Sequence, residues 1–181
     1  TLDFLPFCCA HILDDKEQQS RCIDAMKAFN APHSVMLLEI DAVNMYDTAA
    51  ENMGKVFIST ELGGGGSTSA YTVEIAKKGI RNLLRHAGIC QGDLEVSETL
   101  NLDMPDHRCY IFSETTGLVE HCVDLGDSVK EGQLVAKVHN IERTGEAPVE
   151  YFAGIDGIYT GRHYPGLVVN GDFLGVVAVP A

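Results

Sequence analysis

The sequence predicts an α/β protein in which a mixed sheet with covering helices is followed by a small all-β barrel or sandwich. Apolar stripes at helical spacing alternate with short apolar runs from the start of the chain to about residue 90. The helical patterns then stop, and one segment of the remainder occurs twice. We therefore divide the chain into an α/β part, residues 1–100, and a β part, residues 101–181.

The first helix is predicted over residues 14–29, where an apolar stripe runs through Cys22 and Phe29 and two aspartates suit the start of the helix. Asn30 ends this pattern. The short apolar run over residues 34–40 then predicts a buried strand. Helix followed by buried strand is the beginning of an α/β alternation.

The alternation continues with a second helix, strand and helix. The segment DTAAENMG predicts a short helix that Gly54 closes, and residues 55–60 follow as a strand. A longer amphipathic helix is predicted over residues 69–86, with Gly88 ending it. A complete sheet needs more strands than these residues supply.

The β part contains an internal repeat, because residues 117–138 align with residues 157–178 and their glycines coincide. Each copy consists of a predicted strand, a glycine turn, a short strand, a glycine-containing hairpin and a final strand. Two such copies predict a barrel or sandwich with pseudo-twofold symmetry, in which each half completes the sheet of the other.

The first copy, GLVEHCVDLGDSVKEGQ, resembles the repeat of the biotinyl/lipoyl hammerhead. Carriers of that kind present a modifiable lysine on the turn between their halves. The joining segment here has no lysine, and none occurs after Lys137. We therefore expect an architectural role for this part, or a role as the wall of a neighbouring site.

Composition excludes several classes of partner. Thirteen basic residues against twenty-six acidic ones give a net charge of −13, which repels nucleic acid and anionic membrane surfaces. No apolar run approaches the roughly 20 residues that span a bilayer, and the N-terminus lacks a signal-peptide pattern. Six cysteines without a C-x-x-C pair are expected to be reduced, with Cys8 and Cys9 buried. These features predict a cytoplasmic protein.

The chemistry of the first part centres on Glu61 and the four glycines after it, Gly63 to Gly66. A phosphate loop needs a lysine directly after the glycines, but the next lysine is Lys77, and a dinucleotide fingerprint lacks its third glycine. Two interpretations remain. Glu61 is either a solvated loop carboxylate or a general base at the carboxyl end of a strand. In the second case the glycines, which have no side chains, let a ligand approach the backbone closely.

A metal-assisted base needs metal ligands, and the residues present do not offer a convincing set. His11 and Asp14 are three apart, His33 precedes a strand, and His86 suits a helix C-terminus. The histidines of the β part are expected to be structural or exposed; they are His107, His121, His139 and His163.

Three stretches carry a resemblance to a known family: TLDFLPF at the start, LLEIDAVNMYDTAAENMGKVFISTELGGGG, and the helix end RNLLRHAGI. With them the whole chain resembles the succinylglutamate desuccinylase/aspartoacylase family of zinc hydrolases. Within that family the resemblance is greatest to the N-acetyl-diaminobutyrate deacetylases of ectoine degradation.

The resemblance implies a carboxypeptidase-like α/β domain and hydrolysis of the amide between a small acyl group, acetyl or succinyl, and an amino acid. Glu61 matches the family's catalytic glutamate, and Gly63 and Gly64 match the lining of its cleft. The family's zinc ligands lie in G-x-H-x-x-E and D-x-H motifs that this chain lacks, so we expect them before Thr1 and expect the chain to be a C-terminal portion.

The resemblance also implies a homo-oligomer and a small N-acyl amino acid as substrate. Two acidic residues, Glu39 and Asp41, either attract the free ammonium of a diaminobutyrate-like substrate or are ordinary loop or helix-start carboxylates, and the second interpretation is the favoured one. The alternative is a noncatalytic fragment, a scaffold or interaction module without a metal site.

Overall fold

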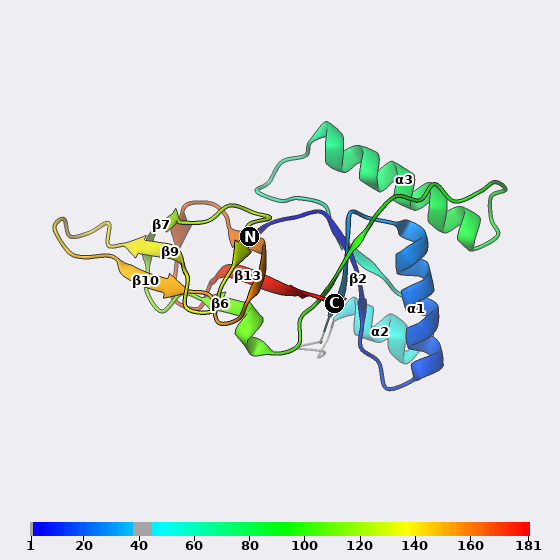
Figure 1. Ribbon diagram of the computed structural model, residues 1–181, viewed down its shortest axis with the longest axis horizontal. Coiled ribbons are helices and arrows are strands. Elements are labelled where there is room, and N and C mark those ends of the chain that lie inside the picture. Colours follow the sequence, from blue (N-terminus) through cyan, green and yellow to red (C-terminus); the bar gives the residue numbers. More distant parts are fainter. Residues whose placement is uncertain (1, 38–44) are drawn as a thin grey trace. The chain divides into compact units, whose positions relative to one another are not determined.

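The computed structural model describes residues 2–37 and 45–181, and these divide into two compact units (Figure 1). The α/β unit comprises residues 6–37, 45–62, 68–103 and 181. The β unit comprises residues 2–5, 63–67 and 104–180. The glycine run after Glu61 therefore groups with the β unit.

The sheet of the α/β unit has the strand order β5-β3-β2-β4. Strands β2 (Phe7–His11), β3 (His33–Leu37) and β5 (Leu100–Asp103) are parallel, whereas β4 (Ser59–Glu61) is antiparallel to β2. This confirms a mixed α/β sheet. The expected strand at 55–60 was placed too early, because only its last two residues belong to β4. Strands β2 and β5 were not predicted from sequence.

Three helices accompany this sheet: α1 (Lys16–Phe29), α2 (Tyr46–Asn52) and α3 (Ala70–His86). The predicted helices are confirmed to within about two residues, which is the usual uncertainty of helix ends. The caps explain their bounds. Asp15 accepts hydrogen bonds from two backbone amides at the start of α1, and Asn30 adopts the left-handed conformation at its end. Ser69 and Thr72 form a capping box that begins α3.

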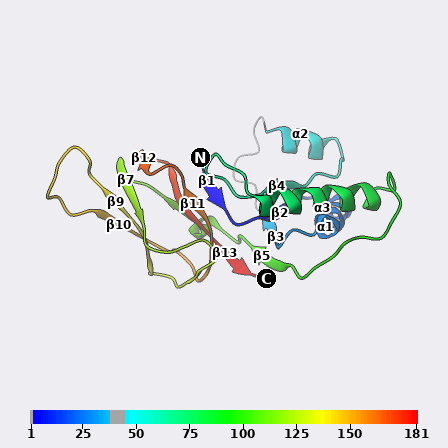
Figure 2. The ribbon, with the colours of Figure 1, turned by 90° about the horizontal axis from the view of Figure 1, so that it is seen from above.

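The core of the α/β unit lies between one face of the sheet and the helices α1 and α3. Cys8 and Ala10 of β2 are buried there with Met26, Phe29 and Ile75. Figure 1 and Figure 2 show α3 crossing α1 at a steep angle. Because successive residues of a strand point to opposite faces, the odd-numbered residues of β2 face away from this core.

The close approach of α1 and α3 depends on Gly79. A Cβ at this position would lie 2.3 Å from the Phe29 ring. Glycine is therefore present for packing, despite its cost of about 1 kcal/mol in a helix interior.

The β unit contains two groups of paired strands. One sheet has the strand order β10-β9-β7-β12. In the other group the neighbouring strands are β1-β11-β13, β6 also pairs with β13, and β8 also pairs with β11. Their bounds are β1 Leu2–Phe4, β6 Tyr110–Phe112, β7 Gly117–His121, β8 Ser128–Val129, β9 Leu134–His139, β10 Val149–Phe152, β11 Gly157–His163, β12 Leu167–Val168 and β13 Phe173–Pro180. A short 3-10 helix, His107–Cys109, precedes β6.

The two aligned segments exchange their short strands. Strand β8 of the first segment pairs with β11 of the second, with Val129 opposite Gly157, and β12 of the second pairs with β7 of the first, with Val168 opposite Gly117. A Cβ on Gly117 would lie 2.2 Å from a backbone oxygen of β9, and a Cβ on Gly157 would lie 2.4 Å from one of β13. Each segment therefore completes the strand pairing of the other.

All six cysteines lie in the described residues and are free, and Cys8 and Cys9 are buried. This confirms the expectation that the thiols at these two positions are buried. Among the helices described in residues 2–37 and 45–181, none is both long enough and apolar enough to cross a membrane.

Candidate active site

Glu61 is the last residue of β4 and lies directly opposite Phe7 of β2. Residues opposite each other in an antiparallel pair project from the same face. Glu61 therefore lies on the face of the sheet that turns away from the α1–α3 core. Its side chain is exposed, yet partial desolvation of the carboxyl raises its pKa. A carboxylate with increased proton affinity, at a strand end, can accept and return a proton.

Two residues farther along the same face, Cys9 and Ser59 are partners in the strand pairing. Their Sγ and Oγ atoms are 2.9 Å apart. Burial is the main cause that raises the pKa of the Cys9 thiol, and the negative charges of Glu61 and Asp47 raise it further. Cys9 is therefore a neutral thiol rather than a nucleophile.

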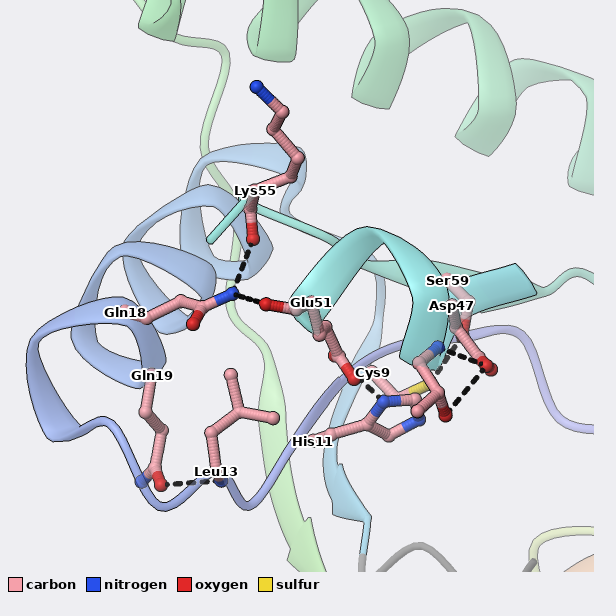
Figure 3. A network of polar contacts seen from close by, with 10 residues as sticks. Cys9, His11, Leu13, Gln18, Gln19, Asp47, Glu51, Lys55 and Ser59 are labelled. Atoms are coloured by element: carbon pink, nitrogen blue, oxygen red, sulfur yellow. Dashed lines mark hydrogen bonds and ion pairs between the residues drawn. The ribbon is translucent and has the colours of Figure 1, made fainter. Parts of the chain in front are cut away.

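His11 extends the same row, and it forms a buried pair with Glu51 of α2 (Figure 3). Its Nδ1 lies 2.9 Å from Glu51 Oε1, and the two side chains are only 5% and 8% exposed. The His11 ring also stacks on Phe57, with ring centroids 6.3 Å apart. Gln18 of α1 stabilises the position of Glu51, because its side-chain amide donates to the backbone oxygens of Glu51 and Lys55 at 2.8 Å each.

A cavity of about 410 Å³ lies beside this pair. Its lining consists of His11, Ile12, Leu13, Asp14, Asp15, Gln18, Thr48, Glu51 and Asn52. His11 and Asp14, the candidate zinc ligands of the sequence, thus line the same cavity. However, the Nδ1 of His11 is paired with Glu51, and Asp14 is exposed.

The described residues do not fit a zinc site of their own. Within residues 2–37 and 45–181, no group of three His, Cys, Asp or Glu side chains could hold a metal ion. The Nδ1 of His33 is 2.9 Å from the Pro6 backbone oxygen, and His86 lies in the last turn of α3. Neither histidine therefore belongs to a group of metal-binding side chains among the described residues.

The glycine run has a conformational explanation within the β unit. Gly63, Gly65 and Gly66 have positive φ angles of 96°, 61° and 71°, which side chains disfavour. A Cβ on Gly64 would lie 2.2 Å from the Leu2 backbone oxygen. The run therefore lets the chain turn and pass close to Leu2, and this requirement holds whether or not Gly63 and Gly64 line a cleft.

Sequence reasoning missed four residues on or beside the Glu61 face: Cys9, Ser59, Asp47 and Glu51. A strand prediction for FCCAH would have supplied the signal, because it puts Cys9 and His11 on one face. The expected acidic residues Glu39 and Asp41 lie outside the described residues.

Comparison with known proteins decides the family. Residues 1–87 match the succinylglutamate desuccinylase/aspartoacylase catalytic domain, and the similarity to individual relatives extends over almost the whole chain. The chain belongs to the succinylglutamate desuccinylase/aspartoacylase family.

Among its relatives is the N-alpha-acetyl-L-2,4-diaminobutyric acid deacetylase of Halomonas elongata, which is 47% identical over 180 residues, 98% of this chain and 53% of the relative. The product-bound structure of the ectoine utilization protein EutE (DoeB) from Ruegeria pomeroyi is 57% identical, with a TM-score of 0.96 over 99% of this chain and 55% of that one.

A succinylglutamate desuccinylase from Silicibacter sp. TM1040 is 56% identical, with a TM-score of 0.94 over 100% of this chain and 55% of that chain. The chain thus spans about half the length of these family members.

Proposed function

We propose that the protein hydrolyses the amide bond of an N-acyl amino acid and removes an acetyl or succinyl group, with N-acetyl-diaminobutyrate as its substrate. The observation that carries this proposal is the position of Glu61, a partly desolvated carboxylate at the end of β4, in a chain 47% identical to a diaminobutyric acid deacetylase. The high similarity to EutE supports the same substrate class.

Glu61 acts in this proposal as the group that moves the proton. It accepts a proton from the water that attacks the acyl carbonyl, so a C–O bond forms. It then gives that proton to the amide nitrogen while the C–N bond breaks. The products are a carboxylic acid and an amine. The acid then passes its proton to the amine, so that a carboxylate and an ammonium leave, and Glu61 returns to its starting state. A raised pKa suits both halves of this cycle, because the group must bind the proton and release it.

The proposal includes zinc, with ligands from sequence outside this chain. The described residues offer no ligand set. A zinc ion in such a site polarises a carbonyl and lowers the pKa of bound water. Gly63 and Gly64 are proposed as cleft-lining backbone.

The test is metal analysis of the full-length protein, together with an activity screen on acetylated and succinylated diamino acids. We expect one zinc per subunit and release of acetate from N-acetyl-diaminobutyrate. Metal-loaded protein that hydrolyses none of these amides would refute the proposal.

A noncatalytic scaffold is the second candidate, and it is favoured by the lack of a metal-ligand group among the described residues. It predicts a full-length protein without stoichiometric zinc and without amidase activity. The same experiment therefore separates the two functions.

Several further expectations accompany the enzymatic proposal. The six free cysteines support a cytoplasmic location. The acidic composition argues against nucleic acid and membrane partners. The strand exchange of the β unit supports its likeness to a biotinyl/lipoyl hammerhead without the modified lysine. We also propose that the protein forms a homo-oligomer, which light scattering of the purified protein tests.

A further inference from the structure

Asp47 is a buried carboxylate that the proposed reaction does not use. It lies in the first turn of α2 and is only 9% exposed. Its Oδ1 accepts a hydrogen bond from the Thr48 amide at 2.6 Å, and the Thr48 hydroxyl lies 3.4 Å from the same oxygen. In the described part of the chain, no side chain or backbone group donates to its Oδ2. One oxygen of a nearly buried carboxylate is therefore available to a ligand.

The position of Asp47 is fixed by the rest of α2. Glu51, one turn farther along the helix, is paired with His11 of β2, and Gln18 of α1 holds the backbone of Glu51. These contacts join α2 to the strand whose neighbour carries Glu61. Figure 3 shows Asp47 near Cys9 and Ser59 in this network.

Asp47 and Glu61 both lie near Cys9. Asp47 lies beside the Cys9 and Ser59 side chains (Figure 3), and Glu61 is two residues from Ser59 on the same face of the sheet. The charges of both carboxylates also raise the pKa of the Cys9 thiol. Cys9 and Ser59 are in contact at 2.9 Å, and they share the sheet face of Glu61. Two carboxylates around a neutral, polar floor are suited to a small ligand that carries a positive charge.

We propose that Asp47 is a specificity-determining residue that binds the free ammonium group of a diamino-acid substrate while Glu61 serves the amide bond. This inference rests on the proposed amidohydrolase function and adds a selective site for the second amine. The Glu51 carboxylate cannot take the same role as readily, because His11 already occupies its Oε1.

The test compares two substrates that differ only in this charge: N-acetyl-2,4-diaminobutyrate and N-acetyl-2-aminobutyrate. Full-length Asp47→Asn is assayed on both. Asparagine has nearly the same size and keeps an oxygen that accepts from the Thr48 amide. We expect kcat/KM for the diamino substrate to fall by about 10- to 100-fold, the usual worth of a charged hydrogen bond. The neutral substrate should change by less than about 3-fold.

Asp24→Asn is the matched control, because Asp24 is an exposed aspartate of α1 and the change removes the same charge. It should leave both substrates unchanged. An equal loss on both substrates in Asp47→Asn would show that Asp47 supports structure and would overturn the inference.

Binding of the products gives a second readout that does not need turnover. Calorimetry should show that 2,4-diaminobutyrate binds the wild type more tightly than 2-aminobutyrate, and that Asp47→Asn removes this preference. Wild-type protein that binds both amino acids equally would overturn the role of Asp47 even if deacetylase activity is present. Preferential binding without any amide hydrolysis would instead support Asp47 and refute the proposed reaction.

Discussion

Phe7 of β2 and Glu61 of β4 lie directly opposite each other in an antiparallel strand pair. This single relationship puts the proposed proton-transfer residue on the sheet face that turns away from the α1–α3 core. It also puts Glu61 in register with Cys9 and Ser59, and so connects it with the network that holds α2. A three-residue strand therefore decides what surrounds the carboxylate.

Replacement of Glu61 by glutamine tests its role in proton transfer. The amide keeps the size of the side chain but cannot cycle a proton, so kcat should fall by about 10² to 10⁴. The zinc content of the full-length protein should not change. Steady-state assays with metal analysis provide the measurement. Glu74→Gln, an exposed change on α3, serves as control and should retain activity. Near-normal turnover of Glu61→Gln would sink the assignment.

The pH dependence of kcat/KM should follow the ionisation of Glu61. Desolvation raises the pKa of this carboxyl, and only the ionised form can accept the proton from water. Activity should therefore fall as the pH decreases, with a midpoint above the ordinary glutamate value of roughly 4.3. A pH profile of the free enzyme measures this midpoint. An acidic limb at or below the ordinary value would contradict a desolvated base.

Loss of the His11–Glu51 pair should destabilise the α/β unit. Both side chains are more than nine-tenths buried, so Glu51→Ala leaves a buried imidazole without its carboxylate. We expect a loss of about 1–3 kcal/mol in the free energy of unfolding. Glu120→Ala is the matched control, because Glu120 pairs with His139 at 2.6 Å on the surface. That change should cost about 0–1 kcal/mol.

Urea unfolding followed by circular dichroism gives both values, provided that the denaturant dependence is the same for each variant. Equal losses for the buried and exposed pairs would show that burial of the His11–Glu51 contact adds nothing to stability.

Gly117 and Gly157, the aligned glycines of the two repeated segments, should respond alike to substitution. A Cβ on Gly117 or Gly157 would meet a backbone oxygen at 2.2 or 2.4 Å, and backbone cannot move aside as a flexible side chain does. Each alanine variant should lose about 1–3 kcal/mol of stability. At Gly166 the nearest atom is a flexible leucine methyl at 3.2 Å, so alanine there should have a smaller effect.

Thermal unfolding of the three variants measures the differences in melting temperature. If only one of Gly117→Ala and Gly157→Ala lowers the melting temperature, the two segments do not carry equivalent strand contacts.

Much of the architecture could be predicted because its signals are local. Helical periodicity and caps are properties of neighbouring residues, which is why α1 and α3 begin and end close to the predicted positions. Strand β2 was missed because five residues with two cysteines give no clear period. Strand β5 was missed because it lies in an acidic, turn-rich segment, and its pairing with β3 supplies the stability that its own sequence does not indicate.

The candidate site was likewise predictable only in part from the sequence. The sequence by itself determined the family resemblance, the glycine run and the repeat in the β unit, and it predicted the role of Glu61 from its match to the family's glutamate. Only the tertiary structure decided that Glu61 shares a face with Cys9 and Ser59, that His11 pairs with Glu51 instead of Asp14, and that Asp47 is buried nearby. These relationships join residues as far as about 50 positions apart, and strand register and helix docking, which create them, have no signal in a local stretch of sequence.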